Sequence, residues 1–134
     1  MILSLFQKMK VTHKEISALN NEHNQLQIMR SIKEDVSQPA MAKEIGFSIG
    51  KVNFILKALI EKGWVKTERF IASNQKMKYR YLLTEEGIKE KMSLTQKFID
   101  CKRMEYEVLQ KELKEDEEKW EGVKVNDNEQ HKKV

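Results

Sequence analysis

The stretch SIGKVNFILKALIEKGWVK, residues Ser48–Lys66, combines one helix face suited to burial with a first turn suited to something else. Its apolar residues recur at the i, i+3, i+4, i+7 spacing of an amphipathic helix. They are Val52, Ile55, Leu56 and Leu59. The first turn instead contains Gly50 and Asn53, two residue types that lower helix stability. We therefore predict a helix over 49–62 whose first turn serves binding.

A shorter helix precedes this one and is joined to it by a tight turn. Ser37 is a suitable N-cap, and Gly46 ends the short helix as a residue at positive φ does. Ser48 then caps the helix over 49–62, and Gly63 follows its end. Two helices in this arrangement form a helix-turn-helix.

The residues before this pair give a less regular pattern. Apolar residues at three-residue steps predict an amphipathic helix over 22–35. Two alternatives stay open for residues 1–20. They form an N-terminal arm, or a short helix capped at Thr12 with Glu15 as its capping-box partner.

After Gly63 the apolar pattern changes to a period of two. The runs WVKTERF (64–70) and KMKYRYLL (76–83) are rich in β-forming residues with charges between them. The polar residues Ser73–Gln75 separate the two runs and suit a turn. These features predict a β-hairpin, and a basic hairpin directly after a helix-turn-helix is the wing of a winged helix.

The last predicted helix begins after Thr84 and carries a heptad-like apolar seam. The predicted dimerisation residues on this seam are Ile88, Met92, Thr95, Ile99, Tyr106, Leu109 and Leu113. A helix over 85–119 is about 50 Å long, which a single small domain does not cover. We therefore expect a homodimer through this helix, with parallel and antiparallel pairing both open.

The predicted fold class is mainly α with a small β-hairpin, a winged helix-turn-helix followed by a long C-terminal dimerisation helix. We divide the chain into an N-terminal arm or short helix, a DNA-binding domain, the dimerisation helix and a disordered tail. These parts are 1–20, 21–84, 85–119 and 120–134.

Charge is concentrated in the middle of the chain. Residues 37–83 contain nine basic and three acidic residues, a net charge of +6, whereas the whole chain has a net charge of +4. A cationic segment of this kind is typical of a protein that binds nucleic acid. The partner that the sequence predicts is double-stranded DNA.

In a helix-turn-helix the N-terminal residues of the second helix contact base edges in the major groove. The predicted base-reading residues are Gly50, Lys51, Asn53 and Phe54. Glycine lets the backbone approach, lysine donates to guanine, asparagine pairs with adenine, and phenylalanine meets a thymine methyl. The predicted phosphate contacts are Ser37, Gln38, Ser48, Lys57, Arg69, Lys76, Lys78 and Arg80. The alternative is that both surfaces are only solvated and serve solubility.

The blocks SQPAMAKEIGFSIGKVNFILKALIEKGWVK and YLLTEEGIKEK carry a family likeness. They resemble the MarR-type winged-helix regulators, in particular the EPS-associated MarR-family transcriptional regulators. The resemblance implies a homodimeric, cytoplasmic DNA-binding protein with an exopolysaccharide-associated role. Larger MarR proteins form their dimer and a ligand pocket with helices from both chain ends. The N-terminal portion here is short and polar, so a small-molecule effector is not predicted.

Other classes of function find little support. No Gly-rich phosphate loop, metal-ligand cluster or nucleophile–base pair is visible, so we expect no enzyme, cofactor or metal. The single cysteine, Cys101, excludes an intrachain disulfide, and no apolar run is long enough to span a membrane. The alternative function is a winged-helix protein–protein interaction module with a coiled-coil helix. The operator, the effector and the choice between repression and activation are not predicted.

Overall fold

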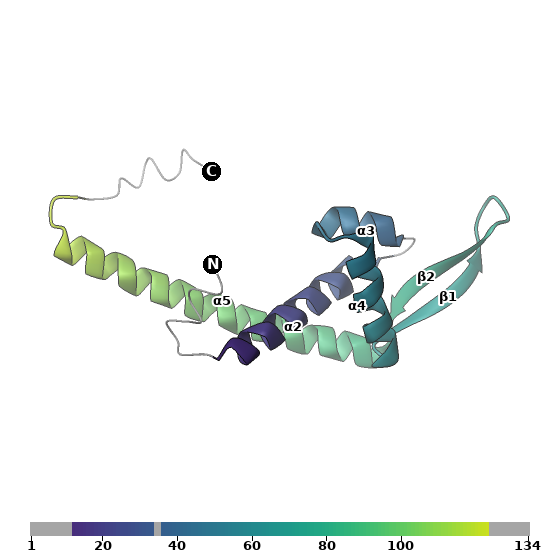
Figure 1. The fold of residues 1–134 in the computed structure, drawn as a ribbon, viewed down its shortest axis with the longest axis horizontal. Coiled ribbons are helices and arrows are strands. Elements are labelled where there is room, and N and C mark those ends of the chain that lie inside the picture. The colour runs from purple at the N-terminus through teal and green to yellow at the C-terminus, as the bar shows by residue number, and fades with distance from the viewer. Residues whose placement is uncertain (1–11, 34–35, 124–134) are drawn as a thin grey trace. The chain divides into compact units, whose positions relative to one another are not determined.

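The computed structural model of the chain describes residues 12–33 and 36–123. In chain order its elements are α2 (His13–Ser31), α3 (Gln38–Ile45), α4 (Ile49–Glu61), β1 (Val65–Ile71), β2 (Met77–Leu83) and α5 (Glu85–Lys119), shown in Figure 1. The predicted fold class is confirmed. Residues 1–11 of the predicted arm and 124–134 of the predicted tail lie outside the described residues.

The helix α2 begins at the predicted Thr12 cap and continues into the segment predicted as a separate helix over 22–35. The Thr12 N–H donates to Glu15 Oε2 (3.1 Å), and the Glu15 N–H donates to Thr12 Oγ1 (3.2 Å), which completes a capping box. No glycine or proline interrupts the chain after this cap, so the two predicted segments form one helix. The predicted end near residue 35 is wrong. The helix ends at Ser31, whose hydroxyl donates to the Ile28 carbonyl (2.7 Å), and the next backbone is extended.

The helices α3 and α4 have the predicted caps. Ser37 Oγ accepts from the Ala40 N–H (3.2 Å), and Ser48 Oγ accepts from the Lys51 N–H (3.1 Å). Gly46, at φ +85°, forms the turn between the helices. The helix α4 ends at Glu61, one residue earlier than predicted, because Lys62 is its C-cap.

One hydrophobic core supports α2, α3, α4, the hairpin and the start of α5. Its fully buried side chains are Ile28, Met29, Met41, Val52, Leu56, Leu59 and Val65. The four predicted core positions of α4 are all buried. Each fully buried side chain of this size stabilises the fold by about 1.5–3 kcal/mol. This core fixes the opposite face of α4 toward solvent.

The strands pair antiparallel, with Val65 opposite Leu83 and Ile71 opposite Met77. Trp64 stays outside β1 because its N–H donates to the Leu59 carbonyl (3.0 Å) and its carbonyl accepts from the Thr84 N–H (3.0 Å). The hairpin therefore starts directly from the end of α4, and its register fixes which side chains share a face.

The first turn of α5 is tied to the end of α4. Thr84 Oγ1 accepts from the Gly87 N–H (3.0 Å) and donates to the Gly63 carbonyl (2.6 Å). A Cβ added to Gly87 would lie 1.9 Å from the Trp64 carbonyl oxygen. Only glycine fits at this helix position.

The chain divides into two compact units after Phe98. From Ile99 onward, α5 carries large apolar side chains that are about half exposed, among them Tyr106 (62%) and Leu109 (52%). None of the helices among the described residues is long and apolar enough to cross a membrane.

Candidate nucleic-acid interface

The face of α4 opposite the core holds four predicted contact residues. Gly50, Asn53, Phe54 and Lys57 recur at i, i+3, i+4, i+7. Phe54 is 75% exposed, although phenylalanine is usually buried. A Cβ added to Gly50 would meet nothing within 4 Å. The glycine therefore has no packing role, and its position leaves open space beside the backbone.

Lys51 lies at the start of α4 and folds back onto the protein. Its Nζ is 3.9 Å from the centroid of the Phe47 ring. A cation–π contact at an exposed site stabilises by about 0.5–1 kcal/mol. The lysine must give up this contact in order to reach a base.

Asn53 is half-buried and hydrogen-bonded. Its Oδ1 accepts from Gln38 Nε2 (3.2 Å), and the same Nε2 donates to the Tyr81 hydroxyl (2.8 Å). Gln38, predicted as a phosphate contact, thus connects α3, α4 and β2. Tyr81 was not predicted as a site residue, since a separation of 43 residues in sequence gives no local signal.

The four predicted phosphate contacts on the wing differ in the interactions that their charged groups make within the protein. Arg80 NH2 lies 3.1 Å from Glu68 Oε2, its partner across the hairpin. Arg69 lies over the Tyr79 ring, 5.6 Å from its centroid. Lys76 and Lys78 are exposed, and they form no ion pair with the described residues. Of the four predicted wing contacts, these two lysines have neither an ion pair nor a ring contact among the described residues.

The N-terminal ends of α3 and α4 and the wing together line an open groove of about 970 Å³. Ser37 and Gln38 line it from α3, Ile49 from α4, and Lys78 and Tyr81 from β2. Several predicted contacts from separate parts of the sequence therefore meet on one surface. Ser37 in the groove and Ser48 outside its lining are both exposed, although their hydroxyl oxygens already serve as N-caps.

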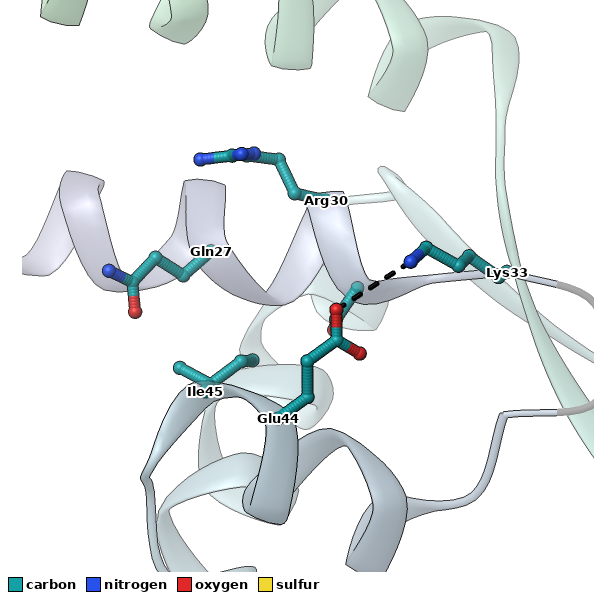
Figure 2. A pocket seen from close by; sticks show the side chains of 6 residues that line it. Gln27, Arg30, Lys33, Glu44 and Ile45 are labelled. Atoms are coloured by element: carbon teal, nitrogen blue, oxygen red, sulfur yellow. Dashed lines mark ion pairs between the residues drawn. The ribbon is translucent and has the colours of Figure 1, made fainter.

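A smaller hollow of about 430 Å³ lies between the end of α2 and α3 (Figure 2). Lys33 Nζ and Glu44 Oε1 are 3.6 Å apart across it, and the Arg30 side chain points away from this pair. Both partners of the ion pair are exposed, and such pairs contribute only about 0–1 kcal/mol. Among the described residues, no group of three His, Cys, Asp or Glu side chains could hold a metal ion.

Comparison with known proteins agrees with this geometry. Residues 22–66 match the family model of the winged helix-turn-helix DNA-binding domain. Staphylococcus aureus MepR, in a structure described as a MepR–DNA complex, is 16% identical with a TM-score of 0.53, and the match covers 97% of this chain and 77% of that one. Staphylococcus aureus MarR, in complex with salicylate and kanamycin, is 15% identical with a TM-score of 0.52, over 97% and 85% of the two chains. No curated protein matches at a significant level.

Proposed function

We propose that this chain is a homodimeric, sequence-specific transcription regulator. The match to the winged helix-turn-helix DNA-binding family model over residues 22–66 and the fold shared with MepR and MarR support the proposal. It binds double-stranded DNA in the cytoplasm. DNA binding is assigned to residues 21–84 and pairing to residues 85–119. No catalytic role is part of the proposal.

The observation that carries this proposal is the exposed face of α4 beside a basic wing. A helix whose outward face carries a glycine, an amide, an exposed phenyl ring and the Lys57 ammonium fits the major groove. The uncompensated charges of Lys76 and Lys78 fit the phosphates on either side. The MepR structure described as a DNA complex has the same fold.

A dimer formed through α5 contains two copies of α4, one from each chain, that can both contact DNA. Six apolar side chains of the predicted seam are 46–67% exposed, and they are Ile88, Met92, Ile99, Tyr106, Leu109 and Leu113. A second copy that covers this seam brings two α4 helices onto one DNA site. Successive major grooves on one side of the duplex are about 34 Å apart, so the proposed site has two related halves.

A protein-interaction module is the second candidate, because the wing tip is also apolar. Ile71 is 69% exposed and Met77 is 51% exposed. A mobility-shift titration at 50 and 200 mM salt separates the two functions. Binding dominated by six or more phosphate contacts falls by about 10³-fold or more over this range. Failure to bind a random pool of duplexes at 50 mM salt would contradict the proposed function.

A further inference from the structure

The carboxamide of Gln38 holds three elements of the interface together. Gln38 is the first residue of α3, directly after the Ser37 cap. Its Nε2 carries two hydrogens and donates to two acceptors, Asn53 Oδ1 on α4 and the Tyr81 hydroxyl on β2. Both bonds are partly buried. The amino group of Gln38 is therefore used within the protein, and a phosphate contact through it would require one bond to break.

The bond from Gln38 selects one of two orientations of the Asn53 side chain. A carboxamide has an acceptor end and a donor end, and Gln38 engages the acceptor end. Within the described part of the chain, no protein atom accepts a hydrogen bond from Asn53 Nδ2. Asn53 is half-buried on the outward side of α4, so its unused donor is what remains for a ligand.

We infer that Gln38 is a positioning residue that determines sequence specificity by fixing which end of the Asn53 carboxamide meets the DNA. This inference rests on the proposed function. Asn53 then donates to a base that offers an acceptor in the major groove, such as purine N7, guanine O6 or thymine O4. Adenine stays compatible, because Asn53 Oδ1 has a second lone pair for the adenine amino group.

The inference predicts a coupling between Gln38 and Asn53 that a direct phosphate contact would lack. The test uses full-length wild type, Gln38→Met, Asn53→Ala and the double variant. The probes are the duplex most enriched by wild type from a random-sequence pool and a scrambled duplex of equal composition. The quantity measured is the ratio of the two dissociation constants, which uniform changes in phosphate binding do not alter.

Gln38→Met is expected to lower this ratio by about 3- to 10-fold, the range for loss of one hydrogen bond. The double variant should discriminate no less than Asn53→Ala alone, because Gln38 acts through Asn53. The inference is wrong if Gln38→Met leaves the ratio of dissociation constants unchanged. It is also wrong if the double variant lowers this ratio by the product of the two single-variant effects. A wild type that does not discriminate between the probes would overturn the proposed function and the inference with it.

Gln38→Glu gives an independent test based on the polarity of the contact. A carboxylate only accepts hydrogen bonds, so Asn53 must turn its Nδ2 toward Glu and present Oδ1 to the DNA. Selection with this variant should move the preference toward cytosine, which offers only its N4 amino donor in the major groove. The added charge weakens all complexes, but it does not by itself change the preferred base. An unchanged preference would contradict the inference.

Discussion

Gly50 and Gly87 both lie inside helices, yet their surroundings differ completely. A Cβ at Gly87 would collide with the Trp64 carbonyl, whereas a Cβ at Gly50 would meet nothing within 4 Å. Gly87 packs against Trp64 and is therefore required by the fold. Gly50 is required by no contact among the described residues, so its presence points to the surface that α4 offers to a partner.

Alanine substitution should separate these two roles. Gly87→Ala should lower the free energy of unfolding by about 1–3 kcal/mol, because the start of α5 must move away from Trp64. Gly50→Ala should raise it by about 0.5–1 kcal/mol and weaken binding to the selected duplex. Thermal unfolding and mobility shift measure the two effects. A Gly50→Ala variant that binds as tightly as wild type would refute close approach of the backbone.

The role of a single residue can be predicted from sequence where it depends only on its neighbours in the chain. Ser37, Ser48 and Gly46 have their predicted capping or turn roles because each acts within a few residues of itself. The bonds from Gln38 to Asn53 and Tyr81 were missed. They join residues 15 and 43 positions apart, and no spacing rule relates such positions before the fold is known.

The basic side chains of the wing differ in whether they form an ion pair with another described residue. Pairing across the strands places Glu68 opposite Arg80 and so compensates the charge of one of the four predicted phosphate contacts on the wing. The alternating pattern of 64–70 and 76–83 predicts a hairpin. It does not predict that Glu68 faces Arg80, because the pairing of residues across the hairpin depends on where each strand begins. Lys78 keeps its charge toward solvent and is the wing residue best suited to a phosphate.

Lys78→Ala should weaken binding to selected and scrambled duplexes equally. Loss of one phosphate contact lowers the slope of log K against log salt by about one unit. Lys89→Ala on α5 is the matched control, since Lys89 is exposed and pairs with Glu85 at 3.6 Å. Binding constants measured at four salt concentrations give both slopes. Equal slopes for Lys78→Ala and wild type would remove Lys78 from the interface.

Helix boundaries were predicted less well than helix identity. The helix α2 joins two segments that the sequence left separate, because Asn20 and Asn21 are tolerated inside a helix that buries Ile16 before them and Leu26 after them. The long helix α5 was predicted to within a residue at both ends. Its four-and-three spacing, with apolar residues at most positions, makes such a helix the easiest element to recognise.

The exposed seam of α5 sets the proposed oligomeric state. Leu109→Glu should convert the dimer to a monomer at micromolar concentration, because a charge buried against a second copy is unpaired. Ser93→Glu changes the charge equally at an exposed position of α5 outside the seam and should leave the dimer intact. Sedimentation velocity distinguishes the two species. A Leu109→Glu protein that sediments as wild type would exclude the seam as the dimer interface.

In the proposed complex the first turn of α4 contacts base edges while the wing contacts the DNA backbone. Selection from a random-sequence duplex pool, performed with wild type and with Asn53→Ala, measures this most directly. Wild type should enrich a site with two related halves about one helical turn apart, and Asn53→Ala should lose the preference at matching positions of both halves. Enrichment of the same site to the same degree by both proteins would contradict it.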